Sequence, residues 1–426
     1  MARTTRIRGT GRRRAHGQFP LTFGYIDCRG AVMDKQLLGD VAAGTHVVDA
    51  TMFWSATGGG VRRYLLAKHA WMARYTGWRH TIAAPVADLP GIAALPAVPL
   101  PGSGGYRLPL RRRALSAALQ ALEPNLIEAG DPYRLAWAVL DAADALGIPA
   151  VAFCHSNLAL LAAELAGPPF ARAAAAAARR YARRLYGRFD LVLAPSEAMR
   201  GRLADWGVER VVCQPLGVDT RVFHPARASA MWRNRLGVPP DTRLLVYAGR
   251  FAPEKHLDVL ADAVRRLGPP YTLLACGAGR RPPSGDRVLV HPFVTDPMAL
   301  ARILASADAF VHAGDQETFG LSVLEAMACG TPAVARAAEG LAELVDDSVG
   351  AAVHDDRAES YADAISRLFR RDRQDMSRHA RERAESYDWN QMLPLQLMHY
   401  RQLLRDGPRR ERGPLPPRRS TASLPQ

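Results

Sequence analysis

Two carboxylates, Glu317 and Glu325, flank a loop-to-helix junction in the second half of the chain. An apolar pattern with helical spacing begins at Leu321, which predicts a polar loop around Glu317 and a helix whose first turns contain Glu325. Free backbone N–H groups at Phe319, Gly320 and Leu321, together with the helix dipole, would form an anion site. A diphosphate fits there, and each carboxylate could accept hydrogen bonds from hydroxyls at one end of a sugar-diphosphate-ribose ligand. The pair alone is equally compatible with a capped, solvated helix start.

Two cations follow an apolar strand pattern at Leu244–Ala248. Arg250 and Lys255 fall at the carboxyl end of this predicted strand, where open α/β sheets bind their ligands, and both charges suit a pyrophosphate. The chain contains only two other lysines, Lys35 and Lys68, among many arginines. This rarity indicates a point-charge role for Lys255. A solvated, helix-capping cation would explain either residue singly but not the pairing at a strand end.

A run of glycines, Gly58, Gly59 and Gly60, precedes a helical pattern that starts at Val61. Glycines at a helix start let a ligand's phosphate approach the backbone closely, although a turn can need glycines for its geometry alone. The dinucleotide fingerprint GxGxxG is absent here. No acidic residue stands where a nicotinamide ribose would need one, which argues against a dehydrogenase.

The elements that must position these residues alternate along the whole chain. Short apolar strand patterns separated by helical patterns predict parallel sheets in doubly wound α/β domains. A Pro-bearing connector at Pro215–Pro225 divides them into two halves, and 426 residues suit two domains of about 150–200 residues. We therefore expect two Rossmann-like domains facing across a cleft. The predicted strands are His46–Asp49, His80–Ala84, Asn125–Glu128, Pro149–Cys154, Leu191–Ala194, Arg210–Gln214, Leu244–Ala248, Thr272–Cys276, Val288–Val290, Ala309–His312 and Ala333–Ala335.

Several blocks resemble the retaining glycosyltransferases of family 4, which have the GT-B fold. Besides the two segments above, GGGVRRY (58–64), VAFCHS (151–156), LVLAPSEAMRGRL (191–203) and PLGVDTRVFHP (215–225) match the family's motifs. The matches keep the family's order from roughly residue 45 to 390. Three segments are similar in sequence to the lipid-directed mannosyl and sulfoquinovosyl branch of the family, namely GVDTRVFHP, APEKH and HAGDQETFGL.

The resemblance implies that the two domains bind different substrates. Residues 19–225 would form the acceptor-side domain and residues 226–388 the donor-binding domain. A helix at 389–405 would cross back to the first domain. Composition predicts disordered basic tails at 1–18 and 406–426, which are rich in Gly, Pro, Arg and Ser without hydrophobic periodicity.

The resemblance also assigns roles to the candidate residues. His155 ends an apolar strand ahead of Ser156 and Asn157, which can cap the next helix; by resemblance this histidine lies beside the transferred sugar and the β-phosphate. Gly277 would lie near the nucleotide, although a simple turn explains it almost as well. The expected catalytic residues are Glu317, His155, Arg250 and Lys255, and the expected donor-binding residues are Gly59, Gly60, Arg250, Lys255, Gly277, Phe319, Gly320, Leu321 and Glu325.

Neither a metal nor a bound cofactor is expected. GT-B enzymes characteristically need no catalytic metal, and the histidines show no metal-ligand spacing such as HExxH. One position departs from the family: Glu339 stands where relatives more often carry a second glycine. This side chain could narrow the rim of the donor site.

Charge and composition narrow the function further. Of the formal net charge of +15, residues 1–18 contribute +6 and residues 406–426 contribute +3. These tails could bind an anionic membrane or keep the protein in solution. Aromatic content is 7%, too low for the aromatic-rich basic patches of a single-strand nucleic-acid binder. No apolar run could span a bilayer, no secretory signal is evident, and the cysteines lack CxxC pairing. We expect a cytoplasmic protein that could lie at the inner face of the membrane.

These observations predict a retaining glycosyltransferase. It would move a mannose- or glucose-type hexose from a GDP- or UDP-linked donor to a hydroxyl of a lipid or saccharide acceptor. The rivals are a sucrose- or trehalose-type synthase or a phosphorylase on the same fold, and a non-catalytic basic membrane or nucleic-acid adaptor with a vestigial sugar site.

Overall fold

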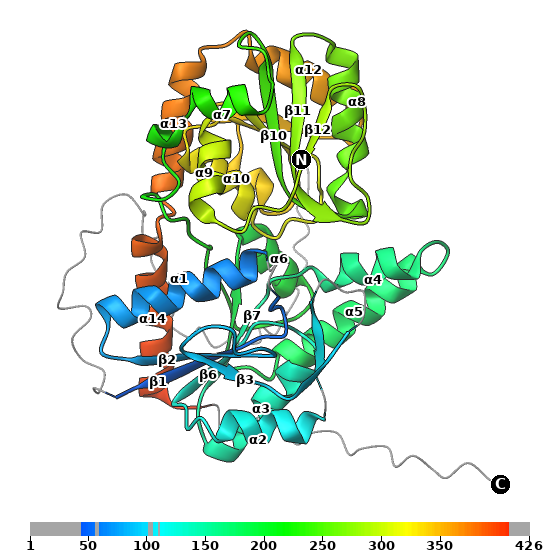
Figure 1. Cartoon of the computed structure of the whole chain (residues 1–426). Helices are drawn as coiled ribbons and strands as arrows, with labels where there is room; N and C mark the ends of the chain where they lie inside the picture. The colour runs from blue at the N-terminus through cyan, green and yellow to red at the C-terminus, as the bar shows by residue number, and fades with distance from the viewer. Residues whose placement is uncertain (1–43, 56–58, 101–104, 110, 409–426) are drawn as a thin grey trace, which may run out of the picture.

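The protein folds into two α/β domains stacked one above the other (Figure 1). The computed structural model describes residues 44–55, 59–100, 105–109 and 111–408. The predicted tail at 1–18 and residues 409–426 of the predicted tail at 406–426 lie outside the described residues, as do Cys28, Lys35 and Gly58.

The first domain contains a seven-stranded parallel sheet in the order β3-β2-β1-β6-β7-β8-β9. Strands β1, β6 and β7 are buried along their whole length, as parallel strands covered on both faces must be. Figure 1 shows α1 and α14 on one face of this sheet and α2 and α3 on the other. The elements are β1 (His46–Ala50), α1 (Gly60–Tyr75), β2 (Arg79–Ala84), β3 (Ile92–Ala94), β4 (Ala97–Pro99), β5 (Arg107–Pro109), α2 (Arg112–Gln120), β6 (Leu126–Ala129), α3 (Arg134–Leu146), β7 (Ala150–Phe153), α4 (Leu158–Ala166), α5 (Ala171–Tyr186), β8 (Leu191–Ala194), α6 (Glu197–Asp205) and β9 (Val211–Cys213).

The second domain contains a six-stranded parallel sheet in the order β12-β11-β10-β13-β14-β15. Helices α8 and α12 cover one face of it, and α9, α10 and α13 cover the other (Figure 1). The two doubly wound domains predicted from the sequence are thus confirmed. The remaining elements of the chain, of which the last returns to the first domain, are η2 (Pro225–Arg227), α7 (Ala230–Arg235), β10 (Arg243–Phe251), η3 (Pro253–Lys255), α8 (Leu257–Leu267), β11 (Tyr271–Gly279), β12 (Val288–His291), α9 (Pro297–Ala305), β13 (Ala309–His312), α10 (Leu321–Ala328), β14 (Ala333–Arg336), α11 (Leu341–Leu344), β15 (Gly350–Val353), α12 (Ala358–Leu368), α13 (Arg373–Glu385) and α14 (Trp389–Asp406).

Two chain segments connect the domains and run side by side, one at Val218 and the other at Trp389. The amide of Val218 donates to the carbonyl of Tyr387 at 2.9 Å, and the amide of Trp389 donates back to the Val218 carbonyl at 3.2 Å. Helix α14 then packs on α1 of the first domain. A Cβ at Gly217 would lie 2.5 Å from the Trp389 ring, so only glycine lets the two segments approach this closely.

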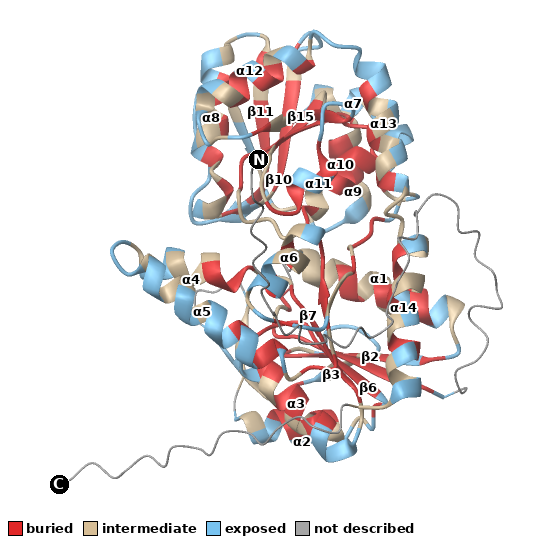
Figure 2. Ribbon diagram, turned by 180° about the vertical axis from the view of Figure 1, so that it is seen from behind, coloured by how far each residue is buried: buried red, intermediate tan, exposed pale blue. Residues whose placement is uncertain are grey.

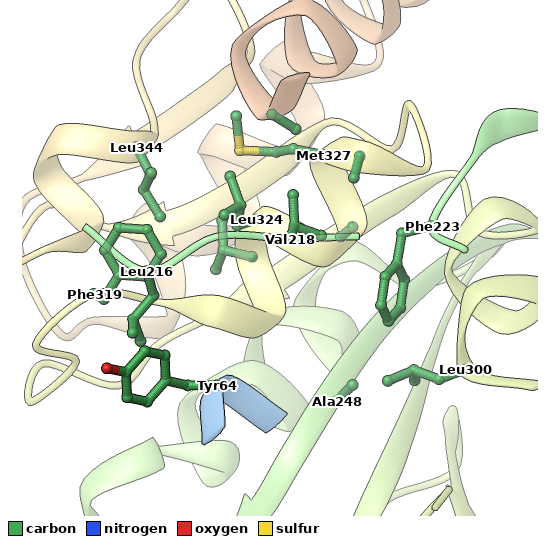
Figure 3. Close-up of a cluster of buried hydrophobic side chains, with 14 of the residues drawn as sticks. Tyr64, Leu216, Val218, Phe223, Ala248, Leu300, Phe319, Leu324, Met327 and Leu344 are labelled. Atoms are coloured by element: carbon green, nitrogen blue, oxygen red, sulfur yellow. The ribbon is translucent and has the colours of Figure 1, made fainter. Parts of the chain in front are cut away.

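Hydrophobic side chains of both domains meet at this junction. Figure 3 shows Tyr64 of α1 and Leu216 of the connector beside Phe319 and Leu324 of the second domain. All four side chains are buried. Burial is greatest in the two sheets and decreases toward the outer faces of the helices (Figure 2).

The described cysteines are all free thiols, and Cys154, Cys276 and Cys329 are buried. Among the residues that the structure covers, no helix combines the length and the apolar character needed to cross a membrane.

Candidate functional site

A cavity of about 250 Å³ lies between the two domains. Both sheets contribute to it through the loops that follow their strands, which is where open α/β sheets bind ligands. It contains most of the predicted site residues. Its walls include Gly59, Gly60, Arg63, His155, Arg250, Lys255, His312, Glu317, Phe319, Gly320, Leu321 and Glu325.

Lys255, Glu317 and His312 form a charged group at one end of the cavity. The adjacent strands β10 and β13 bring them together, because Lys255 ends η3 just after β10 and Glu317 follows β13. The Lys255 Nζ lies 2.5 Å from Glu317 Oε1, and His312 Nε2 lies 3.2 Å from the same oxygen. Burial alone would raise the pKa of Glu317, but the charge of Lys255 and the bond to His312 hold it well below its usual value. Glu317 is therefore an ionised hydrogen-bond acceptor, and it cannot serve as an acid at neutral pH.

The loop before α10 presents backbone N–H groups to the cavity. Among the described residues, the amides of Phe319, Gly320 and Leu321 donate no backbone hydrogen bond, as expected at the start of a helix. Gly320 has φ +99°, and a Cβ there would lie 2.3 Å from Leu341 Cδ2. Glycine is thus required at this position by the backbone, and it leaves the amides open to an anion.

Glu325 lies in α10 at the other end of these amides and is only 2% exposed. Its Oε1 accepts a hydrogen bond from Arg63 of α1, whereas its Oε2 has no partner among the described residues. Burial raises the pKa of Glu325, and the Arg63 charge opposes this rise. A ribose diol could take the free oxygen directly, and it would have to displace Arg63 to take both.

Arg63 was not among the residues predicted from the sequence. It belongs to the first domain but pairs with a carboxylate of the second, so it bridges the cleft. A signal was present in the motif GGVRRY. The first turn of α1 contains two arginines and no acid, although the dipole at a helix N-terminus favours acidic side chains.

The glycines at the start of α1 face the donor loop across the cavity. A Cβ on Gly60 would lie 3.5 Å from Leu321 Cδ2, and a Cβ on Gly59 would meet nothing within 4 Å. Neither residue has a positive φ. Backbone geometry therefore does not require glycine at either position, which favours a role in ligand approach.

His155 enters the cavity from the end of β7. Its ring stacks on Phe153 at a centroid distance of 4.3 Å and lies 5.6 Å from the ring of Tyr64. Burial lowers the pKa of His155 to about 3, so the ring is neutral. Its Nε2 has no partner among the described residues and is free to bond a ligand hydroxyl. Asn157 caps α4 as predicted, accepting from the amide of Leu160 at 3.2 Å.

Two further predicted positions differ in their surroundings. Arg250 reaches the cavity, but its side chain is 64% exposed and pairs with Glu254 at 3.4 Å. Gly277 is not among the lining residues, and a Cβ there would lie 1.9 Å from the carbonyl of Gly249. Sheet packing thus accounts for this glycine, and its contact with the nucleotide remains a prediction.

Glu339 also lies away from the cavity wall. It pairs with Arg202 of α6 at 2.6 Å, so it links the second domain to the first. Nearby, the Glu343 carboxylate accepts hydrogen bonds from the amides of Glu197 and Ala198, at the start of α6. These contacts hold the two domains together beside the cavity.

A buried charge network underlies the cavity wall in the first domain. Lys68 of α1 is 0% exposed; its Nζ lies 2.8 Å from the Asp49 carboxylate and 3.5 Å from Glu128 Oε1. The hydroxyl of Tyr64 donates to Glu128 at 2.9 Å, and Lys68 donates to the hydroxyl of Tyr400 in α14 at 2.6 Å. Lys68 and Lys255 thus both pair with carboxylates, whereas the sequence analysis drew attention to Lys255 alone.

Comparison with known proteins accounts for this two-domain site. A family model described as Glycosyltransferase Family 4 matches residues 58–222, and one described as Glycosyl transferases group 1 matches residues 229–386. The chain is 33% identical to a GDP-mannose-dependent alpha-(1-6)-phosphatidylinositol dimannoside mannosyltransferase of Mycobacterium tuberculosis, over 69% of this chain and 78% of the relative. The chain belongs to glycosyltransferase family 4. The family resemblance of the sequence motifs is thus confirmed.

Two further similarities extend this family 4 assignment. A GDP-mannose-dependent alpha-mannosyltransferase of Corynebacterium glutamicum is 26% identical over 77% of both chains. The solved structure of sucrose-phosphate synthase from Thermosynechococcus elongatus matches with a TM-score of 0.71 at 21% identity, covering 85% of this chain and 100% of that one. The predicted GT-B fold is therefore confirmed, and the protein is a glycosyltransferase that uses a nucleotide sugar.

Proposed function

We propose that this glycosyltransferase moves mannose from GDP-mannose to a hydroxyl of an inositol-containing glycolipid, with retention of anomeric configuration and without a metal. The names of the mannosyltransferases from Mycobacterium tuberculosis and Corynebacterium glutamicum support the donor, and the name of the former supports the acceptor. The observation that carries the proposal is the order of groups along the cavity: an ionised Glu317, three open amides, then the buried Glu325.

This order matches the parts of a sugar nucleotide. Glu317 would accept hydrogen bonds from the hexose hydroxyls, and Glu325 from the ribose diol. The diphosphate would lie between them on the Phe319–Leu321 amides, with its charge compensated by Lys255 and Arg250. These groups supply the positive charge that a metal would otherwise provide.

Transfer begins when the bond between the anomeric carbon and the diphosphate oxygen breaks. The sugar becomes oxocarbenium-like, and Lys255, Arg250 and the amides stabilise the charge that develops on the leaving group. The acceptor hydroxyl attacks from the face that the diphosphate leaves, so configuration is preserved. Its proton passes to the departing phosphate oxygen, and no separate protein base is needed. The neutral His155 can hydrogen-bond a sugar hydroxyl without placing a competing positive charge beside the cationic sugar.

A ligand panel tests the donor. GDP-mannose and GDP should raise the melting temperature, because a ligand at about 100 times its dissociation constant stabilises by about 2.7 kcal/mol. UDP-glucose should have a much smaller effect. The reverse order would show that the guanosine assignment is wrong.

The product tests the stereochemistry and the metal requirement. With GDP-mannose and a soluble inositol glycoside as acceptor, NMR of the product should show an α-linked mannose. Excess chelator should leave the rate unchanged. A β-linked product would overturn the retaining mechanism, and a rate abolished by chelator and restored by a divalent cation would overturn metal independence.

A further inference from the structure

Helices α4 and α5 form a hairpin that projects from the body of the first domain (Figures 1 and 2). Helix α4 begins at Leu158, three residues after His155, so the hairpin starts next to the cavity wall. The two helices pack mainly on each other along their outer part. Nothing in the glycosyl transfer described above uses this projection.

The tip of the hairpin, residues 165–170, is apolar and exposed. Leu165 is 80% exposed and Phe170 is 67% exposed, more than any other large apolar side chain that the structure describes. The residues between them, Ala166, Gly167, Pro168 and Pro169, have no polar side-chain atom. An apolar tip held in water indicates a contact surface.

The outer face of α5 is strongly basic. The helix contains five arginines and no acidic residue, and the side opposite them buries Ala182, Leu185 and Tyr186 against the domain. All five arginines are exposed, and none makes an ion pair with a residue in the described part of the chain. They are Arg172, Arg179, Arg180, Arg183 and Arg184. The only acid on the hairpin, Glu164 of α4, accepts a hydrogen bond from Gln316 of the second domain at 3.2 Å.

We propose that this hairpin docks the enzyme on an anionic lipid bilayer, with the tip in the headgroup region and the arginines on lipid phosphates. An apolar edge beside a basic face is the pattern of interfacial helices, and each arginine near an anionic surface attracts it. A nucleic acid would use the arginines but leave the tip in water. A second copy of the chain would bring two basic faces together.

Docking through the hairpin would bring the cavity close to a lipid acceptor in the bilayer. This role of the docking rests on the proposed lipid acceptor. Helix α4 begins three residues after His155, so a hairpin that lies along the bilayer brings the cavity wall next to the membrane surface. An acceptor headgroup could then reach the cavity while its acyl chains stay in the bilayer. The hydrogen bond that Gln316 donates to Glu164 links the hairpin to the donor loop, one residue before Glu317.

Sedimentation with vesicles tests the docking without any donor or acceptor, so its result does not depend on the proposed reaction. The full chain should sediment with vesicles of phosphatidylcholine mixed with phosphatidylglycerol, and much less with phosphatidylcholine alone. Arg179→Ala, Arg180→Ala and Arg184→Ala combined should lower the partition coefficient about 100-fold, since each arginine contributes about fivefold. Leu165→Ser with Phe170→Ser should abolish the binding that survives high salt. All five side chains are exposed, so circular dichroism should stay unchanged.

Matched substitutions on the second domain serve as controls. Met231→Ser removes a side chain that is 65% exposed, and Arg367→Ala with Arg370→Ala removes two exposed arginines. These variants should sediment like the parent chain. Hairpin variants that sediment like the parent would overturn the proposal, as would binding that is lost only on deletion of residues 1–18. A dimer in analytical ultracentrifugation that Leu165→Ser with Phe170→Ser dissociates would assign the tip to a second copy and also overturn it.

Discussion

Replacing Lys68 with methionine should destabilise the fold strongly and in a pH-dependent way. Methionine fills a similar volume but removes the cation that contacts both Asp49 and Glu128. Lys68 and both carboxylates are at most 1% exposed, so solvent cannot replace the lost charge. Breaking a buried ion pair by removing one partner costs about 3–5 kcal/mol, against about 0–1 kcal/mol for a surface pair.

Each buried carboxyl can take up a proton instead of remaining as an unpaired charge. The free energy of that protonation therefore sets an upper limit on the loss of stability that each carboxyl causes. Relative to the ordinary Glu pKa of 4.5, keeping Glu128 protonated at pH 7 costs about 3.4 kcal/mol, and at pH 5 about 0.7 kcal/mol. Burial already raises the pKa of Glu128, and the Lys68 charge opposes that rise. Without Lys68 the folded variant binds more protons than its unfolded chain, so its stability falls as pH rises above 4.5. We expect a loss of about 3–5 kcal/mol at pH 7 that shrinks to about 1 kcal/mol at pH 5.

Urea unfolding followed by circular dichroism at pH 5 and pH 7 measures both values. The parent chain, unfolded at the same two pH values, is the reference for each loss. In the parent chain burial raises the pKa of Asp49, but Lys68 and His80 lower it by more, to about 2. The stability that the ionised Asp49 contributes is therefore lost only as pH falls below 3.8. Adding Glu128→Gln to the variant should recover part of the loss, since one buried charge is removed. Arg266→Met, which breaks an exposed pair with Glu359, should change stability by less than about 0.5 kcal/mol. A loss at pH 7 below about 1 kcal/mol, or one equal at both pH values, would refute the electrostatic reasoning.

Three predictions concern the cavity. Lys255→Ala and Arg250→Ala should each lower turnover about 100-fold or more with unchanged circular dichroism, because each removes charge stabilisation of the leaving group. Near-normal turnover in both variants would remove these cations from the mechanism. Glu325→Gln should weaken GDP and GDP-mannose alike by about 1–3 kcal/mol in calorimetry, whereas Glu317→Gln should lower turnover and leave GDP affinity nearly unchanged. Equal loss of GDP affinity in both would show that their roles along the donor are wrong. Arg63→Met should make GDP affinity fall more steeply from pH 8 to pH 5.5 than in the parent chain, since an unpaired buried Glu325 takes up a proton more readily and then accepts less well from the ribose. Parallel pH profiles for the two proteins would contradict this role of Arg63.

The arrangement of strands was predictable because buried parallel strands leave a strong local pattern. Predicted strands at Leu191–Ala194 and Ala309–His312 coincide with β8 and β13, and the others deviate by a few residues at their ends. Strands β3, β4, β5 and β15 were missed, since the first three have only three residues each and Gly350–Val353 starts with glycine. Local apolar periodicity carries little signal over such lengths.

The candidate site was predictable where its residues lie close together in the chain. Glu317, the three amides and Glu325 belong to one short segment, so their order along the cavity follows from a loop and a helix start. The contact between Arg63 and Glu325 joins residues 262 positions apart, and the Lys68 network includes Tyr400, 332 positions away. Such pairs depend on how the two domains and α14 meet, which no local pattern encodes.

Helix α1 connects these long-range features. Its first turn presents Gly60 and Arg63 to the cavity, and its next residue, Tyr64, lies between His155 and the buried carboxylate of Glu128. One turn further, Lys68 anchors the helix to the sheet and to α14. Apolar side chains of similar size would often stabilise a core as well or better than buried ions. Yet each hydrogen bond of the network fixes the position of α1 more narrowly than apolar contacts would, because a donor and an acceptor must meet within about 3 Å. The buried charges thus hold the arginine that faces Glu325 and the ring that packs against His155 in one defined position.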